Sequence, residues 1–322
     1  MSTCRTARAG HVGQPISMYR VYGLTAANGR LTGGGVRMRF GAHVSVAGGL
    51  AAAVDYAVSV GCECMQVFAK SPRQWNARDL DAEAAAAFRD RCSASGMGPV
   101  FTHTAYLINL GSDDDGLWER SWRALADELS RGEALGAAGV VTHVGTRYKS
   151  APERTAGRIA RGVDLAWMAS GAVETRLLLE NTAAAGTTFG DGPDELGAVL
   201  ERLDAAHGHT GVCLDTCHAH AAGWDLAQPH TWDELLGAFE VCCGMPIELI
   251  HANDCAFGPG EHKDRHAWIG DGTIGVDGFR RMVSEARLSG VPVITEMPGE
   301  APVKDAENIN RLKRLRDGVA VS

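Results

Sequence analysis

Two side chains of types that bind metal ions lie close together in KDRHAWIGDGTIG, residues 263–275. Asp264 and His266 lie two residues apart in this glycine-rich stretch, which has no apolar period. Alternate residues of an extended chain point to the same side, so the carboxylate and the imidazole can face one cation. An isolated Asp-x-His pair is usually solvated, and its interpretation therefore depends on other ligand-type residues converging on the same place.

Six further ligand-type residues each end a short apolar run of the chain. They are His103, His143, Glu180, Asp215, His251 and Glu296. A single such residue is usually hydrogen-bonded or solvated, but six crowded together would repel one another or need neutralising. His218, three residues after Asp215 in LDTCH, can face the same place from the start of a helix.

The donor types indicate which ion would neutralise such a cluster. Five imidazoles and four carboxylates are available once Asp264 and His266 are included. Nitrogen and oxygen donors without thiolate suit zinc, with manganese or iron as alternatives at some of the positions. Cys213 and Cys217 are expected to pack inward and not to bind metal.

Eight short β-branched runs, separated by longer amphipathic segments, would position these side chains. The runs are residues 39–44, 64–69, 99–103, 139–144, 176–181, 211–216, 248–253 and 292–297. This alternation is typical of βα units around a parallel sheet. Eight units without a break in composition predict a single (β/α)8 TIM barrel, whose active site lies at the C-terminal ends of the strands. An open doubly wound sheet is the structural alternative, since periodicity alone does not show closure.

The boundaries of the barrel can also be predicted. Residues 1–37 are rich in Gly, Arg, Ser and Thr without a sustained period, so we expect a flexible extension or a misassigned start. The catalytic barrel domain would then span residues 38–322. Within it, Thr231-Trp-Asp-Glu234 has the form of a capping box and predicts that a helix opens at Thr231.

Composition restricts the class of protein. The chain has 322 residues, of which 45% are hydrophobic and 22% charged, enough to bury a large core. It has no run of eighteen apolar residues and no signal-peptide pattern, which favours a soluble, cytoplasmic protein without membrane association. Nine cysteines without a paired framework favour reduced thiols. A net charge of −8 argues against a generally basic nucleic-acid-binding face, but not against a local site whose positive charge comes from metal ions.

Six motifs carry a resemblance to a known family. They are GAHVSVAGGL (41–50), HTAYLINLGS (103–112), LLLENTAAAG (177–186), GVCLDTCHAHAAGWDL (211–226), IHAND (250–254) and DRHAWIGDGTIG (264–275). In this order they resemble the endonuclease IV family of apurinic/apyrimidinic endonucleases, from about residue 39 to residue 300. The resemblance implies a (β/α)8 barrel with three clustered zinc ions. It also implies base excision repair of DNA, in which the phosphodiester 5′ to an abasic site is cleaved to a 3′-hydroxyl and a 5′-deoxyribose phosphate.

The same resemblance assigns roles to the ligand-type residues. Glu180 would bridge two metals, and His103 and His143 would complete the first of that pair. The second of the pair would be completed by Asp215, His251 and Glu296. The third metal would be held by His218, Asp264 and His266, with the glycines after His266 letting the backbone fold back over it.

Two further residues are implied to contact DNA. Arg73, in SPRQW, and Tyr106, in HTAY, match family residues that enter the base stack and hold the abasic nucleotide out of it. A baseless site is poorly stacked, so its extrusion costs little. The expected partner is double-stranded DNA with abasic sites, bound by a monomer associated with the nucleoid.

Two rival functions remain open from the sequence. A related barrel of the xylose-isomerase type would isomerise or epimerise small sugars with one or two metals. It would not require the third set of ligands or the exposed Arg73 and Tyr106. A barrel that binds damaged DNA or stores metal without turnover is the other rival, and cleavage of a duplex with one abasic analogue separates the three.

Overall fold

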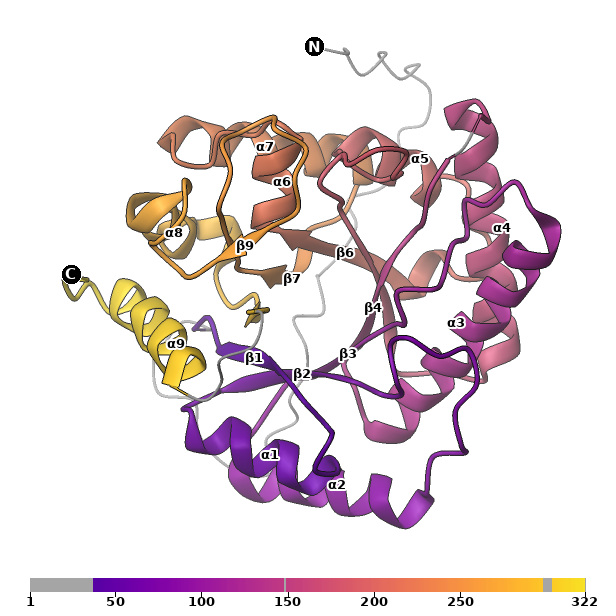
Figure 1. The fold of residues 1–322 in the computed structure, drawn as a ribbon, viewed down its shortest axis with the longest axis horizontal. Coiled ribbons are helices and arrows are strands. Elements are labelled where there is room, and N and C mark those ends of the chain that lie inside the picture. The colour runs from indigo at the N-terminus through magenta and orange to yellow at the C-terminus, as the bar shows by residue number, and fades with distance from the viewer. Residues whose placement is uncertain (1–36, 148, 298–302, 322) are drawn as a thin grey trace, which may run out of the picture.

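A closed barrel of eight parallel strands forms the centre of the molecule (Figure 1). The computed structural model describes residues 37–147, 149–297 and 303–321. The barrel strands are β1 (Phe40–Val44), β2 (Cys64–Phe68), β3 (Val100–His103), β4 (Gly139–His143), β5 (Arg176–Glu180), β6 (Thr210–Asp215), β7 (Ile247–His251) and β10 (Val293–Thr295). Pairing of β1 with β10, beginning at Phe40 and Val293, closes the sheet. The predicted TIM barrel and its eight strands are confirmed, and the open sheet is wrong.

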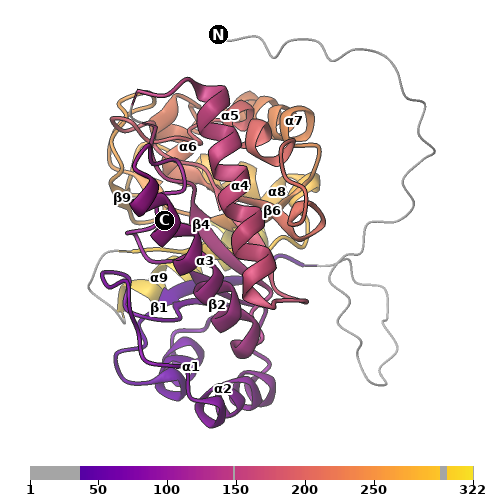
Figure 2. The ribbon, with the colours of Figure 1, turned by 90° about the vertical axis from the view of Figure 1, so that its right-hand side faces the viewer.

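Helices cover the outside of the barrel, and α3 and α4 run side by side along one flank (Figure 2). The helices are α1 (Leu50–Ser59), α2 (Ala82–Ser95), α3 (Asp115–Leu135), α4 (Pro152–Ser170), α5 (Pro193–Leu200), α6 (Thr216–Ala222), α7 (Pro229–Cys243), α8 (Gly275–Ser284) and α9 (Val303–Arg316). Large apolar side chains such as Phe88, Trp232 and Phe239 are buried in the main core. Burial of each such side chain contributes about 1.5–3 kcal/mol.

Helix α7 begins earlier than its capping pattern predicts. The sequence favours a start at Thr231, whereas the helix begins at Pro229, with Gln228 as an N-cap that makes no side-chain capping bond. Proline fits the first helical position because its fixed φ is already helical and its missing N–H has no intrahelical partner there. Thr231 is therefore buried inside the first turn and does not cap the helix.

A seven-residue apolar layer fills the interior of the barrel, separate from the main core. Its members, each from a different strand, are Cys64, Phe101, Val141, Leu178, Cys213, Leu249 and Ile294. On the remaining strand, Gly41 pairs in register with both Cys64 and Ile294. We call these seven side chains the apolar layer, and they make the barrel a packed core without a pore.

A short antiparallel hairpin, β8 (Asp254–Cys255) with β9 (His266–Ala267), returns the chain to the barrel after β7. The buried carboxylate of Asp254 accepts backbone N–H bonds from Gly270 at 2.9 Å, Gly272 at 3.1 Å and Ile274 at 3.0 Å. A Cβ at Gly272 would lie 2.4 Å from Asp254 Oδ1, so only glycine fits. The sequence interpretation assigns these glycines to folding over a metal, and the structure shows in addition that they let the backbone wrap the carboxylate of Asp254.

The ends of the described chain meet on one side of the barrel. Arg37 forms an ion pair with Asp317, which follows α9. The predicted extension, residues 1–37, lies outside the described residues except for Arg37. None of the helices in the part of the chain that the structure describes is long and apolar enough to cross a membrane.

Candidate metal centre

A ring of polar residues lies directly above the apolar layer. Alternate residues of a strand point to the same side, so the residue two positions after each inward-facing one also points inward. These residues, one from each strand or its end, are His43, Gln66, His103, His143, Glu180, Asp215, His251 and Glu296. We call them the polar ring. Its place at the C-terminal mouth is where barrels of this fold carry their active sites.

Glu180 lies at the centre of the polar ring. Its Oε2 is 3.1 Å from His103 Nε2 and 3.4 Å from His143 Nε2, and its Oε1 is 2.9 Å from His251 Nδ1. Burial alone would raise the pKa of Glu180, but the surrounding imidazoles, His143 and His251 foremost, hold that pKa well below its ordinary value. The carboxylate is therefore ionised and shared between neighbours on both sides.

In the described part of the chain, ligand-type atoms gather into four groups, within each of which they lie no more than 4.8 Å apart, and three of these groups contain nitrogen and oxygen donors only. The first group is His103, His143 and Glu180. The second is Glu180, Asp215, His251 and Glu296. The third is Asp215, His218 and His266.

Asp264 joins the third group from the loop before β9. Its carboxylate lies 3.3 Å from His218 Nε2 and 3.4 Å from His266 Nε2. The structure thus brings together all nine residues that the sequence singles out. It differs from the sequence interpretation in one respect, because Asp215 belongs to two groups and is assigned to only one by the family resemblance.

Four imidazoles hold their outer nitrogen in a hydrogen bond. His103 Nδ1 donates to Thr104 O at 2.9 Å, and His218 Nδ1 donates to Asn181 O at 3.0 Å. His266 Nδ1 donates to Glu296 O at 2.7 Å. His251 Nε2 donates to Gln66 Oε1 at 2.9 Å. With the proton on the outer nitrogen, the inner nitrogen of each ring offers its lone pair to the centre of the cluster.

Sequence reasoning missed His43 and Gln66. His43 Nδ1 lies 3.0 Å from Glu296 Oε1, and Gln66 Nε2 donates to the same oxygen at 2.7 Å. Glutamine is not a ligand type, and His43 stands one residue before the end of its strand, so neither fits the pattern of a ligand that ends a strand. His43 and Gln66 stand two residues after Gly41 and Cys64, which face the barrel interior. The alternation of side chains along a strand could therefore have identified them.

The donor set fits metal cations. Among the described residues, His143 Nδ1 and His266 Nε2 are buried without a hydrogen-bond partner. His266 Nε2 stands 3.7 Å from Asp215 Oδ2, too far for a hydrogen bond but close enough to share an ion. Within the part of the chain that the structure describes, the ion pairs of Glu180, Asp215 and Glu296 involve imidazoles alone. When these imidazoles are neutral, as metal ligands must be, the buried carboxylates need positive charge from bound cations.

Cys217 lies close enough to Asp264 and His266 to join a metal group. Its contact with Cys255, together with burial, raises the pKa of the Cys217 thiol. A protonated thiol is a poor ligand, since the thiolate is the form that binds metal. This agrees with the expectation that Cys217 packs inward.

Several known proteins are similar to this chain in sequence and in fold. A family profile described as "Xylose isomerase-like TIM barrel" matches residues 54–320. The chain is 38% identical over 276 residues to the probable endonuclease 4 of Methanoculleus marisnigri, covering 85% of this chain and 98% of that protein. It is 40% identical over 282 residues to the probable endonuclease 4 of Streptomyces coelicolor, covering 86% of this chain and 95% of that protein. The chain belongs to the endonuclease IV family.

Solved structures agree with membership of the endonuclease IV family. The crystal structure of endonuclease IV from Thermus thermophilus matches with a TM-score of 0.78 and 36% identity, covering 87% of this chain and 100% of that one. A D-tagatose 3-epimerase-like protein matches with a TM-score of 0.62 at 15% identity, covering 88% of this chain and 100% of that one, a likeness that shows the fold alone. The family resemblance carried by the six sequence motifs is confirmed.

Two loops of this endonuclease IV family member carry exposed residues beside the polar ring. Tyr106, after β3, is 64% exposed and packs edge-on against Phe68 with ring centroids 5.5 Å apart. Arg73, after β2, is exposed, and the two loops are joined because Tyr106 N donates to Pro72 O at 3.2 Å. Trp75 packs beneath Arg120, 5.3 Å from its guanidinium carbon. Arg73 and Tyr106 are therefore exposed on two joined loops that follow β2 and β3.

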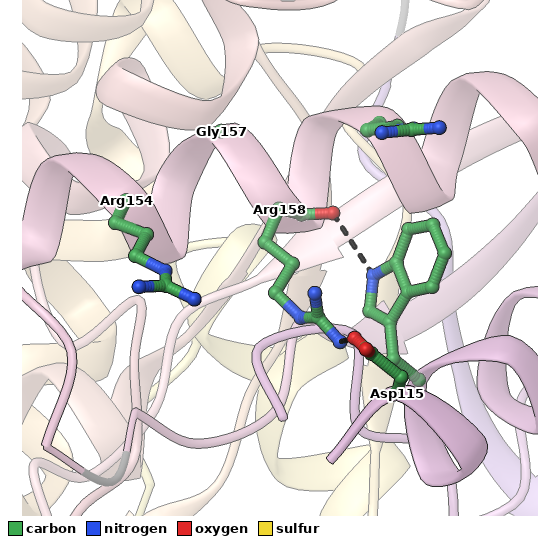
Figure 3. Close-up of a pocket in the computed structure, with 6 residues that line it drawn as sticks. Asp115, Arg154, Gly157 and Arg158 are labelled. Carbon is green, nitrogen blue, oxygen red and sulfur yellow. Dashed lines mark hydrogen bonds and ion pairs between the residues drawn. The ribbon is translucent and has the colours of Figure 1, made fainter. Parts of the chain in front are cut away.

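A hollow between α3 and α4 is a separate feature (Figure 3). Arg158 pairs with Asp115 at 2.6 Å, and its carbonyl accepts the indole N–H of Trp118 at 3.1 Å. The lining contains no imidazole and one carboxylate, together with Arg154, Gly157 and Arg161. These contacts tie the two helices together and do not resemble the donor set at the mouth.

Proposed function

We propose that this protein is a zinc-dependent endonuclease that hydrolyses the phosphodiester 5′ to abasic sites in double-stranded DNA. The products would be a 3′-hydroxyl and a 5′-deoxyribose phosphate, as in base excision repair. The observation that carries the proposal is the cluster of nine nitrogen and oxygen donors at the barrel mouth, in a chain of the endonuclease IV family. The exposed Arg73 and Tyr106 beside that cluster add the means to distinguish damaged DNA.

Three metal ions match the three groups of donors. Glu180 would bridge the first two ions, with His103 and His143 on one side. The other side would hold Asp215, His251 and Glu296. The third ion would take His218, Asp264 and His266, with Asp215 close enough to be shared. When bound, such a cluster lowers the pKa of water and neutralises charge that develops on the attacking and leaving oxygens.

The chain's own residues prepare the site before substrate arrives. The hydrogen bonds from His103, His218 and His266 to backbone carbonyls fix the rings, so the lone pairs need no rearrangement. Glu180 is fully buried and contacts four imidazoles, which keeps its carboxylate oriented between the first two groups. Preorganised groups of this kind avoid reorganisation during the reaction.

DNA would approach the mouth despite the acidic chain. Three dications would change the formal net charge from −8 to −2, and their positive charge would lie at the mouth, where phosphates must bind. Tyr106 would stack in the space left by the extruded abasic nucleotide, and Arg73 would enter the base stack beside it. A sugar isomerase requires neither residue, nor the third group of donors.

A cleavage assay with metal analysis tests the proposal. Purified protein is incubated with a duplex that contains one tetrahydrofuran abasic analogue, and with the matching undamaged duplex. We expect one incision, 5′ to the analogue, which leaves a 3′-hydroxyl end that a DNA polymerase extends. Metal analysis should give three zinc ions per chain. The absence of incision by protein with a full metal complement would overturn the assignment, and turnover of a ketohexose would favour the sugar isomerase.

A further inference from the structure

The two loops that carry Arg73 and Tyr106 have no regular secondary structure of their own. One runs from the end of β2 at Phe68 to the start of α2 at Ala82, and the other from His103 to the start of α3 at Asp115. Exposed loops are usually more mobile than the elements they join. Insertion of a side chain into DNA requires that its direction be fixed. Contacts with the rest of the protein must therefore hold these two loops in place.

Glu128 supports the second loop from beneath. It lies on α3, is 1% exposed, and its Oε1 accepts the backbone N–H of Ala105 at 3.1 Å. Ala105 directly precedes Tyr106, so this bond fixes the backbone from which the tyrosine ring projects. The same oxygen lies 3.6 Å from Lys70 Nζ, which belongs to the other loop.

Lys70 supports the first loop from the same helix. Its side chain is buried, and Nζ donates to Asp127 Oδ2 at 2.7 Å. Arg131, one turn further along α3, donates from Nε to Asp127 Oδ1 at 2.9 Å and from Nη2 to Arg78 O at 2.8 Å. Lys70 and Arg78 lie on either side of Arg73, so α3 holds the loop on both flanks.

Stability alone is a weak reason for this arrangement. Buried ion pairs often stabilise a fold no better than apolar residues of the same size, because desolvation offsets the attraction. Their directional bonds do restrict geometry, and here the bonds of Lys70, Glu128 and Arg131 that leave α3 all connect it to the two loops that carry Arg73 and Tyr106. The direct bond from Tyr106 N to Pro72 O makes the two loops one unit.

We propose that Lys70 and Glu128 are positioning residues that aim Arg73 and Tyr106 at the DNA helix. The inference rests on the proposed function, since it assigns these loops to DNA. Neither residue touches the metal cluster or the reacting phosphate. They act on the substrate through the two loops, and their removal should weaken action on intact duplex while leaving the metal cluster in place.

The test compares two substrates with four variants of the full-length protein. One substrate is a duplex with a tetrahydrofuran site, and the other has a gap opposite that site, where little extrusion is needed. The variants are Lys70→Met, Glu128→Met, which removes the acceptor for Ala105 N–H, the conservative Lys70→Arg, and Glu119→Met as a control. Glu119 forms an exposed ion pair with Arg123 on the same helix, so it matches Glu128 in chemistry but not in contacts.

We expect Lys70→Met and Glu128→Met to lower kcat/KM on the duplex by about tenfold to a hundredfold, the scale of a small misplacement of a binding group. On the gapped substrate the loss in kcat/KM should be less than about threefold, and the zinc content should be unchanged. Lys70→Arg should recover part of the loss on the duplex. Glu119→Met should match wild type. Equal losses on both substrates, or no loss on the duplex, would overturn the inference. If one variant does not fold, the other carries the same comparison. Failure of wild-type protein to cut either substrate would instead reject the proposed function.

Discussion

The apolar layer and the polar ring occupy the same strands, but the first stabilises the fold and the second concentrates buried charge. Leu178 and Glu180, two residues apart on β5, are both fully buried and face the same interior. One packs against apolar neighbours and stabilises the barrel. The other concentrates buried charge that must be balanced by protonated imidazoles or bound cations, which makes its burial costly when no partner is charged.

The difference shows that the backbone does not decide which layer does chemistry. Parallel pairing places Val141 beside Leu178, and two residues later it places His143 beside Glu180. The backbone pairing of β4 with β5 is the same at both levels, and only the side chains differ. Stability and function can therefore be altered separately by substitutions at successive inward positions of one strand, and the following experiments test that separation.

Glu180→Gln should give the largest effect and should act on function alone. The amide keeps the shape of the side chain but cannot carry the charge shared by two metal groups, so we expect cleavage to fall by roughly a thousandfold or more, given that one lost fixed electrostatic contact costs about 100- to 1,000-fold. Cleavage kinetics and circular dichroism provide the measurement. The exposed Glu201→Gln is the control, and activity within tenfold of wild type would show that the bridging role is wrong.

Leu178→Ala should show the reverse pattern. Truncation of this fully buried side chain leaves a cavity in the apolar layer, and we expect a loss of about 2–5 kcal/mol in the free energy of unfolding. Urea denaturation at fixed zinc concentration measures it, with Val58→Ala, on the exposed face of α1, as a control that should change by less than about 0.5 kcal/mol. The folded fraction should retain its zinc. Loss of zinc with unchanged unfolding energy would contradict the separation of the layers.

Tyr106→Ala removes a side chain that belongs to neither layer. Stacking of an aromatic ring on a base is worth about 1–3 kcal/mol, so cleavage of an abasic site in intact duplex should weaken by roughly 5- to 150-fold. Zinc content should not change, and a gapped substrate should be affected much less. Equal losses on both substrates, or zinc missing from the variant, would place Tyr106 in the scaffold of the metal site.

Ala184→Gly, four residues after Glu180, should give the smallest effect and a favourable one. Ala184 has a φ of 57°, a left-handed conformation that glycine adopts without a steric cost. We expect the free energy of unfolding to rise by about 0.5–1 kcal/mol, with cleavage unchanged. The matched control is Ala183→Gly, which should destabilise, because Ala183 is buried and its φ is not positive. A lower melting temperature for Ala184→Gly would count against strain at this position.

Much of the fold could be predicted because its signals are local. The eight strands follow from short β-branched runs, and six members of the polar ring follow from ligand-type residues that end them. Closure of the sheet could not be predicted from periodicity, since an open parallel sheet has the same pattern. The resemblance to the endonuclease IV family, and not the periodicity, indicated that the sheet closes into a barrel.

Other features depended on contacts between distant residues. The hairpin of β8 and β9 has two residues in each strand, too few for a pattern, and is organised by Asp254 reaching Gly270 and Gly272. Gln66 was missed because its role is visible only beside His251 and Glu296. Lys70 and Glu128 lie far apart in sequence, so no spacing rule connects them.

The two-residue step between the layers has a consequence for how barrels of this kind diverge. A substitution in the polar ring leaves the apolar layer intact, so descendants can acquire new donor sets one strand at a time without losing the fold. His43 and Gln66 mark the two strands whose inward residues support ligands of their neighbours. His43 already carries a ligand-type imidazole, and at Gln66 a single substitution to histidine or glutamate would add another ligand-type side chain and a starting point for a different reaction.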